Sequence, residues 1–160
     1  MVNTIAPYLL TKKLLMLMNK EARVINLSSA AQASFNIEDI NKTSLLTESE
    51  LYAQSKLAIT MWSKHMADSL GVSAPSIIAV NPASLLGSKM VKEAYGVVGG
   101  DLEIGVDILV RAALSDEFND ASGKYYDNDK KAFSSPHHDA VNSEKNSKLV
   151  TALDLIVNEF

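Results

Sequence analysis

The sequence contains no cysteine. It therefore offers no disulfide framework, no thiol nucleophile and no metal site with cysteine ligands. This composition fits a reducing compartment, and we expect a cytoplasmic protein. Clustered basic charge is also missing, because Lys and Arg total 15 against 19 Asp and Glu, and only Lys12–Lys13 and Lys130–Lys131 adjoin. Nucleic acid is thus not an expected partner, since binding phosphates requires clustered Lys and Arg.

Long apolar runs are absent as well. The most apolar opening stretch, IAPYLLTKKLLMLM, is interrupted by Lys12 and Lys13, whereas a membrane-spanning helix needs about 20 apolar residues. The start of the chain also lacks the basic segment and small-residue cleavage site of a signal peptide. With 160 residues, 47% hydrophobic and 21% charged, we expect a single globular domain, residues 1–160, around one core.

Hydrophobic periodicity predicts four helices. Thr47 followed by Glu50 has the sequence of a capping box, and Gly71 is typical of a helix end. The longest helix should therefore lie between these signals. The predicted helices cover residues 3–18, about 49–70, about 101–115 and 146–158.

Three short apolar runs between these helices predict strands. They are RVINL at 23–27, SIIAV at 76–80 and GKYY at 123–126. Alternating helices and strands indicate an α/β fold, with a parallel sheet of about three strands and helices on both faces. The first strand would leave one hydrogen-bonding edge open. The polar connection at 30–49 is longer than usual for a compact domain, so we expect it to be functional.

A tyrosine and a lysine four positions apart occur three times. The pairs are Tyr8 with Lys12, Tyr52 with Lys56, and Tyr126 with Lys130. The third pair flanks a turn, and Tyr8 belongs to the apolar stripe of its helix, which favours core packing. Tyr52 and Lys56 instead follow a buried strand that ends at Ser28 and Ser29. Because ligands of parallel sheets bind beyond the carboxyl ends of the strands, we take this pair as the candidate site.

The residue types at the candidate site suit acid–base catalysis. A tyrosine ordinarily titrates near 10, so its use at neutral pH requires about 4 kcal/mol of anion stabilisation. Lys56, one helical turn from Tyr52, would supply the positive charge. A serine hydroxyl would polarise a substrate carbonyl or hold a developing alkoxide. Together these groups suit hydride transfer with a nicotinamide cofactor.

At these residues the sequence resembles the short-chain dehydrogenase/reductase family, which has a serine after a central strand and Tyr-x-x-x-Lys on the next helix. MVNTIAPYLLTKKLL is similar to the preceding helix of the family, and IIAVNPASLLGSKMV to its segment after the sixth strand. ASGKYYDND and the closing helix resemble the retinol dehydrogenase-like branch. The resemblance implies the C-terminal part of a Rossmann-like three-layer fold. The matched part would lack the N-terminal Gly-rich half that binds the cofactor. The glycine cluster that is present, GVVGGD at 96–101, follows no strand and has the pattern of a loop.

The resemblance implies a role for each matched residue. Tyr52 would be the acid/base, and Lys56 would favour its anion and bond the nicotinamide ribose. Ser29, or less favourably Ser28, would polarise the substrate carbonyl, and Asn3 would hold a water. Further contacts to NAD(P)(H) would come from Pro82, Ala83, Leu85 and Ser88.

Two positions depart from the family pattern. Ala83 stands where the family usually has glycine, and alanine there costs stability if its φ is positive. The threonine of the family that contacts the nicotinamide carboxamide falls near Gly87 or Ser88, of which Ser88 has the suitable hydroxyl. No metal site is expected, because PHHD at 136–139 offers adjacent ligands in a turn without further ones.

The implied activity is that of an NAD(P)-dependent oxidoreductase acting on a small-molecule carbonyl or secondary alcohol. The alternative is a truncated, catalytically silent family remnant that acts only as an oligomerising or binding module. In both cases the family resemblance implies a homo-oligomer formed through helices 3–18 and 50–70. The loop 30–49 and the segment 83–100 would line the substrate pocket.

Overall fold

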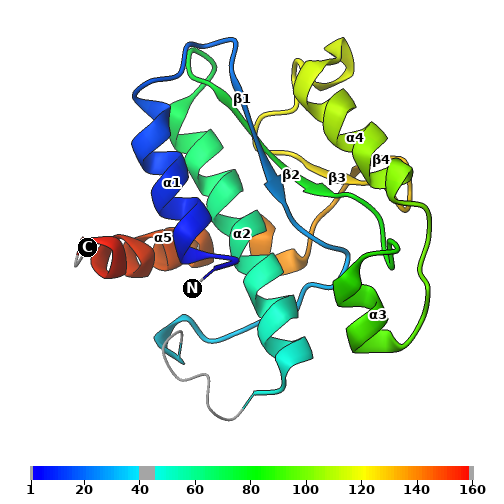
Figure 1. The fold of residues 1–160 in the computed structure, drawn as a ribbon. Coiled ribbons are helices and arrows are strands. Elements are labelled where there is room, and N and C mark those ends of the chain that lie inside the picture. The colour runs from blue at the N-terminus through cyan, green and yellow to red at the C-terminus, as the bar shows by residue number, and fades with distance from the viewer. Residues whose placement is uncertain (1, 40–45, 159–160) are drawn as a thin grey trace.

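The computed structural model describes residues 2–39 and 46–158. Residues 40–45 of the expected substrate loop therefore lie outside the described residues. The elements are α1 (Ile5–Leu15), β1 (Arg23–Leu27), η1 (Ile37–Asp39), α2 (Glu48–Leu70), β2 (Ser76–Asn81), α3 (Lys89–Tyr95), α4 (Leu102–Leu114), η2 (Asp116–Phe118), β3 (Tyr125–Asp127), β4 (Ala132–Ser134), η3 (His138–Val141) and α5 (Ser143–Val157) (Figure 1). All the predicted helices and strands are present, within a few residues of their expected ends. Within the described residues, none of the helices combines the length and apolar character needed to cross a bilayer.

The sheet confirms the α/β prediction and extends it. Its strand order is β1-β2-β3-β4. The first three strands are parallel, as expected, and β4 pairs antiparallel with β3. The prediction of about three strands missed β4, and the predicted element order also missed α3.

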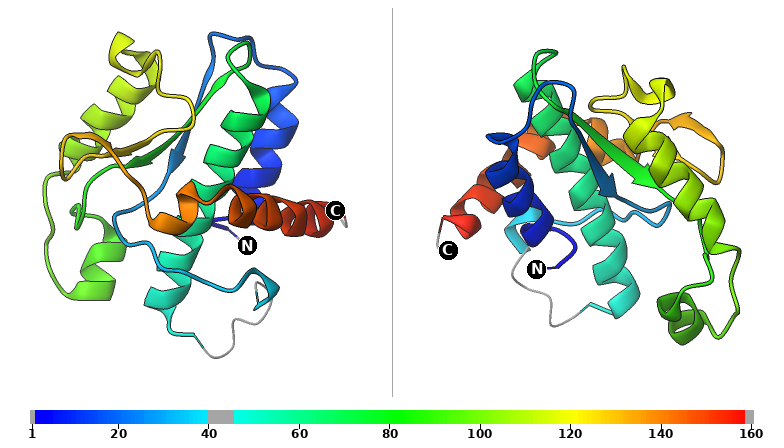
Figure 2. Two further views of the ribbon diagram at one scale, coloured as in Figure 1. Left: turned by 180° about the vertical axis from the view of Figure 1, so that it is seen from behind. Right: turned by 45° about the horizontal axis from the view of Figure 1, so that its top comes forward.

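Helices cover both faces of this sheet (Figures 1 and 2). On one face, α1, α2 and α5 pack around a core that includes Trp62, Leu57 and Ile77. On the other face, α4 packs over Ile78 and Val80 with the segment around Phe118. Neighbouring residues of β2 thus serve opposite cores, which explains why this strand is apolar without alternation.

The long helix α2 begins and ends where local signals predict. The Thr47 side chain accepts a hydrogen bond from the Glu50 backbone N–H, and the Glu50 carboxylate accepts one from the Thr47 N–H, which completes the capping box. Gly71 ends the helix with φ 72, a conformation that favours glycine. These two ends fix which residues of α2 reach the sheet.

The closing helix α5 lies across α1 and α2. Asp154 accepts hydrogen bonds of 2.6 Å from both the Tyr8 hydroxyl and Lys12. Tyr8 is 1% exposed, and its ring meets Trp62 edge-on with centroids 5.5 Å apart. Burial, and then the bond to Asp154, raises the pKa of Tyr8. Tyr8 therefore has the core-packing role that its position in the apolar stripe predicts.

Candidate functional site

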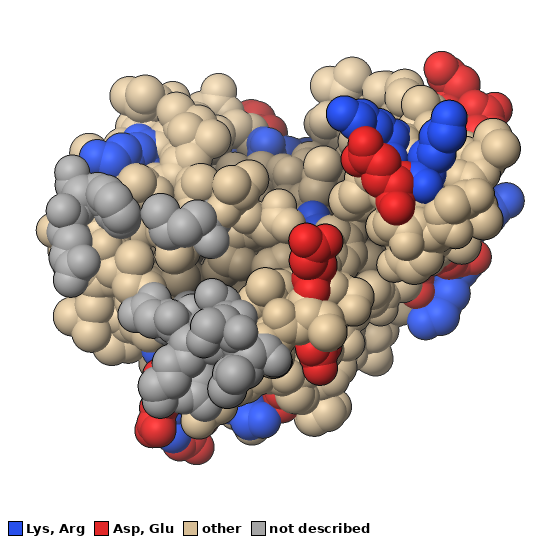
Figure 3. Space-filling view, turned by 60° about the horizontal axis from the view of Figure 1, so that its bottom comes forward, with Lys and Arg blue, Asp and Glu red and all other residues tan. Residues whose placement is uncertain are grey.

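The carboxyl ends of the parallel strands carry the candidate residues. Ser29 follows β1, Pro82 and Ala83 follow β2, and Asn128 and Asp129 follow β3. Since these strands are parallel, the residues after them lie along one edge of the sheet. Figure 3 views the molecule from its lower end in Figure 1, where acidic and basic side chains are interspersed among mostly uncharged ones. The predicted chemistry is therefore expected at this edge of the sheet.

Tyr52 and Lys56 lie together on the first half of α2, and both are half-buried. The Lys56 Nζ atom is 5.5 Å from the centre of the Tyr52 ring. It also donates a hydrogen bond of 2.7 Å to the backbone carbonyl of Leu27, the last residue of β1. Burial lowers the pKa of Lys56. The lysine thus lies over the Tyr52 ring, and it is also bonded to the backbone of the edge strand.

The structure distinguishes the two candidate serines. Ser28 is 3% exposed, lies 2.6 Å from the Thr60 hydroxyl and donates to the Lys56 backbone carbonyl. Ser29 is partly exposed, and its Oγ accepts a hydrogen bond from the Ala31 N–H at 3.1 Å. The hydroxyl hydrogen of Ser29 is therefore left to donate to a ligand. Ser29 stays the candidate of the two, because Ser28 holds β1 against α2.

Asn3 joins the site indirectly. Its Nδ2 lies 3.5 Å from the Ser55 hydroxyl, which in turn donates to the backbone carbonyl of Tyr52 at 2.7 Å. Asn3 and Lys56 also line the same groove beside β1. The start of the chain is thus held against the helical turn that carries the Tyr–Lys pair.

The segment after β2 is fixed by a carboxylate that the sequence did not single out. Asp129 accepts hydrogen bonds from the backbone N–H and the hydroxyl of Ser84 and from the Asn81 amide. Although burial raises the pKa of Asp129, the bonds from Ser84 and Asn81 lower it below its ordinary value. Asn128 also donates to the Pro82 carbonyl at 2.8 Å. In the sequence, the polar run DND at the end of a buried strand was the signal that could have indicated Asp129.

The rest of this segment packs on the glycine cluster. The Leu85 carbonyl accepts a bond from the Gly100 N–H, and the Gly87 N–H donates to the Gly100 carbonyl, both at 2.7 Å. Ser88 caps α3 by accepting from the Val91 N–H. Within the described residues, no hydrogen bond joins segment 82–88 to Tyr52, Lys56 or Ser29. The residues expected to contact the cofactor therefore lie at the same edge of the sheet. In the described part of the chain, they are not hydrogen-bonded to the Tyr–Lys pair.

The glycine cluster does not form a phosphate cradle. A Cβ added to Gly87 would lie 2.8 Å from the Gly100 carbonyl oxygen, and one added to Gly99 would lie 2.7 Å from the Gly87 Cα. These glycines permit two backbone segments to touch each other, which confirms the interpretation of GVVGGD as a loop. In the described residues, the expected pyrophosphate contacts of a dinucleotide thus have no glycine-rich turn to supply them.

Ala83 has the backbone conformation that would cost it stability. Its φ is 143, and that of Leu85 is 51, both in the region that favours glycine. We expect Ala83→Gly to raise the free energy of unfolding by about 1 kcal/mol, because the strain at a non-glycine residue is relieved. Urea unfolding at an unchanged m-value measures the gain.

A matched glycine substitution provides the control. Ala94 is exposed on α3, where glycine weakens a helix by about 1 kcal/mol. Ala94→Gly should therefore lower stability while Ala83→Gly raises it. Equal losses in the two variants would show that Ala83 is not strained.

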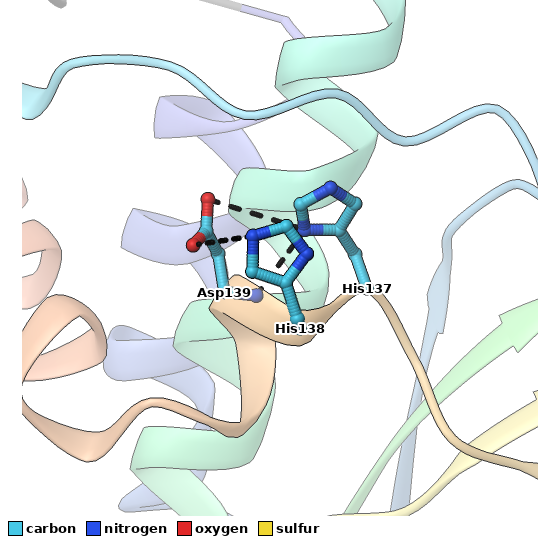
Figure 4. Close-up of side chains that lie close together, drawn as sticks. All are labelled: His137, His138 and Asp139. Carbon is cyan, nitrogen blue, oxygen red and sulfur yellow. Dashed lines mark hydrogen bonds and ion pairs between the residues drawn. The ribbon is translucent and has the colours of Figure 1, made fainter.

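His137, His138 and Asp139 bring three potential metal-ligand atoms within 4.8 Å of one another. Both imidazoles face the Asp139 carboxylate (Figure 4). The carboxylate, however, already accepts hydrogen bonds from Ser34 and from the ammonium of Lys145, and His137 Nδ1 accepts the Asp139 N–H. We interpret this cluster as a structural link that ties the start of α5 to the loop after β1.

One comparison with known proteins bears on this geometry. Retinol dehydrogenase 13 from Homo sapiens is 29% identical over 145 residues, which cover 79% of this chain and 44% of that protein. The similarity supports a distant relationship to the short-chain dehydrogenase/reductases. The chain spans less than half the length of this relative. No family model matches the sequence.

Proposed function

We propose that this chain carries the proton-transfer part of an NAD(P)-dependent oxidoreductase that acts on a small carbonyl compound or secondary alcohol. Tyr52 is the acid/base, and Lys56 stabilises its anion. Ser29 donates a hydrogen bond to the substrate oxygen, and Asn3 holds a water near Lys56. The distant similarity to human retinol dehydrogenase 13 supports this reaction class.

The placement of the Tyr–Lys pair carries the proposal. Lys56 Nζ lies 5.5 Å from the centre of the Tyr52 ring and donates to the carbonyl of Leu27 at the end of β1. In the proposed reaction, this positive charge would stabilise the negative charge that develops on the Tyr52 oxygen during proton transfer. A bound nicotinamide would supply the hydride. When a carbonyl is reduced, the Tyr52 hydroxyl gives its proton to the oxygen that Ser29 holds, and in the reverse direction it takes that proton back.

A chain of residues 1–160 should bind intact dinucleotides weakly. The ribose and nicotinamide contacts proposed for Tyr52, Lys56 and Pro82 cover only part of such a ligand, and the described glycines pack on each other. We expect Kd values for NADH and NADPH above about 1 mM, since few contacts remain to offset the cost of association. Fluorescence titration measures this affinity, and a micromolar Kd would contradict the expectation.

The decisive experiment uses reduced nicotinamide mononucleotide as the hydride donor. This compound lacks the adenosine and its phosphate, so it does not require the missing contacts. With a reporter ketone, the chain should catalyse formation of the secondary alcohol above the rate in buffer at about 1 mM donor or more. If product forms no faster than with an unrelated protein at equal concentration, the enzymatic proposal is wrong.

One observation favours the non-enzymatic alternative. Lys56 donates its hydrogen bond to the Leu27 backbone and not to a catalytic partner. In a catalytically silent binding module, this bond to the Leu27 backbone would be the whole role of Lys56. The donor assay separates the two proposals, because only the first expects turnover.

We also propose that the chain associates with itself through helices 3–18 and 50–70 and that it is cytoplasmic. Exposed Leu10, Met16 and Leu17 on and after α1 support such an interface. In contrast, α5 already covers much of α2, with Leu149 and Leu153 fully buried against it. We therefore expect the contact between copies to use α1 more than α2, and light scattering can test for a dimer.

A further inference from the structure

The backbone carbonyl of Ser29 is held by two side chains. The Tyr125 hydroxyl donates to this oxygen at 3.0 Å, and the Gln32 side-chain amide donates to it at 2.9 Å. The Ser29 Oγ atom in turn accepts the Ala31 N–H. Ser29 is thus bonded at both its carbonyl and its hydroxyl oxygen, directly after β1. We call the Tyr125 and Gln32 side chains on this carbonyl the Ser29 clamp.

Tyr125 reaches Ser29 across an intervening strand. It lies on β3, and β2 separates that strand from β1 (Figure 1), so the two strands are roughly 10 Å apart. Tyr125 pairs in register with Ala79 of β2. Because Ile78 and Val80 belong to the core beneath α4, Ala79 and Tyr125 face α2 on the other side of the sheet. A side chain as small as that of Ala79 lets the Tyr125 ring extend over β2 toward Ser29.

The Tyr125 hydroxyl remains a hydrogen-bond donor at neutral pH. The residue is 5% exposed. Burial, and then the negative charge of Asp127, raises the pKa of Tyr125 above its ordinary value. Tyr125 is therefore unsuited to exchange a proton with a substrate, and its role differs from the one proposed for Tyr52.

The Gln32 amide holds Ser29 at a cost to its own bonding. Its Oε1 atom is buried without a hydrogen-bond partner among the described residues, and an unpaired buried acceptor is unfavourable. The reverse orientation of the amide would place Oε1 against the Ser29 carbonyl oxygen. The same loop is joined to α2 beside Tyr52, because the Ala33 N–H donates to the Ala53 carbonyl at 3.3 Å. The clamp thus fixes Ser29 relative to the helix that carries the acid/base.

We propose that Tyr125 is a positioning residue, which together with Gln32 fixes the Ser29 backbone so that the Ser29 hydroxyl meets the substrate oxygen. This inference rests on the proposed function, because Ser29 touches the substrate and Tyr125 acts only through Ser29. A misplaced hydroxyl forms a weaker hydrogen bond to the negative charge that develops on the substrate oxygen. Loosening the clamp therefore lowers the rate of the chemical step more than it weakens ketone binding.

Tyr125→Phe removes the clamp hydroxyl and leaves the Gln32 bond to the Ser29 carbonyl in place. With reduced nicotinamide mononucleotide at a fixed concentration, we expect kcat for the reporter ketone to fall about tenfold. The KM for the ketone should change less than about twofold. Tyr126→Phe is the matched control, because Tyr126 is 1% exposed, follows Tyr125 on β3, packs in the opposite core and also has a bonded hydroxyl. This variant should keep the original kcat.

Ser29→Ala separates positioning from a general structural role. If Tyr125 acts through Ser29, Tyr125→Phe should lower kcat less than about twofold once residue 29 is alanine. A general structural role would cause the same loss in both backgrounds. The Ser29 clamp is also measurable without substrate, since the carbonyl ¹³C resonance of Ser29 should move upfield when a donor is lost. NMR should show this shift in Tyr125→Phe and an unmoved resonance in Tyr126→Phe.

The possible failures of this inference and of the proposed function give different results. Turnover by the original chain with an unchanged kcat in Tyr125→Phe would overturn the inference alone. Equal losses in the two backgrounds, an equal loss in Tyr126→Phe, or an unmoved Ser29 carbonyl resonance in Tyr125→Phe would do the same. Absence of turnover in the original chain would overturn the proposed function and this inference together.

Discussion

Replacing Tyr52 by phenylalanine should lower the rate of ketone reduction by about 10² to 10⁴-fold. The substitution removes one hydroxyl, which we propose as the group that delivers the proton to the substrate oxygen, and general acid–base catalysis is worth about this much. The tyrosine ring, and with it the contact to Lys56 at 5.5 Å, is retained. The measurement is the initial rate with reduced nicotinamide mononucleotide and a reporter ketone.

The folded state should not change in this variant. Among the described residues, the Tyr52 hydroxyl makes no hydrogen bond, so phenylalanine leaves no buried partner unpaired. The urea midpoint of Tyr52→Phe should therefore match that of the original chain. Tyr95→Phe is the control, because this tyrosine is 61% exposed on α3 and should keep its full rate. Equal rates for Tyr52→Phe and Tyr95→Phe would exclude Tyr52 as the acid/base.

Much of the fold was predictable because its signals are local. Thr47, Glu50 and Gly71 predicted both ends of α2, and the apolar runs predicted β1 and β2. By contrast, β4 has three residues, two of them exposed, and the turn before it has Lys131 at φ 52 where glycine or asparagine is typical. This hairpin depends on pairing with β3. No local pattern in the sequence predicts it.

The omission of α3 and the late predicted start of α5 have a different cause. Ser88 and Gly96 are ordinary helix-cap residues and were visible in the sequence. The family resemblance gives Ser88 a cofactor contact, whereas the structure shows it as the N-cap of α3. Asn142 caps α5 and starts it earlier than the predicted residue 146. In this polar stretch the cap residue Asn142, and not hydrophobic periodicity, marks the start of the helix.

The placement of the candidate residues was predictable from the sequence, but their bonds were not. The strand-then-helix order predicted that Ser29, Tyr52 and Lys56 would lie at one edge of the sheet. The bond from Lys56 to the Leu27 carbonyl depends on which strands are present beside β1, and a helical spacing of four residues carries no such information. The same limit explains why Asp129 was missed, because its partners Asn81 and Ser84 lie far away in sequence.

The single tryptophan, Trp62, lies on α2, the helix that carries the candidate site. Trp62 is 0% exposed and lies in the core shared by α1, α2 and α5. Trp62→Ala should lower the free energy of unfolding by about 4 kcal/mol, because it removes a large buried ring and leaves a cavity. This is a large part of the typical stability of a domain, about 5–15 kcal/mol. Urea unfolding followed by far-UV circular dichroism measures the loss, since the variant has no tryptophan fluorescence.

Trp62→Phe separates the ring from its polar group. The indole Nε1 is buried and has no hydrogen-bond partner among the described residues, so the N–H contributes no bond that phenylalanine would lose. The smaller ring still meets Tyr8 and fills most of the space, and we expect a loss of only about 1 kcal/mol. If Trp62→Phe proves as damaging as Trp62→Ala, the N–H has an essential partner. A small loss in both variants would mean that α2 is held by its contacts with the sheet and not by the helices packed over it.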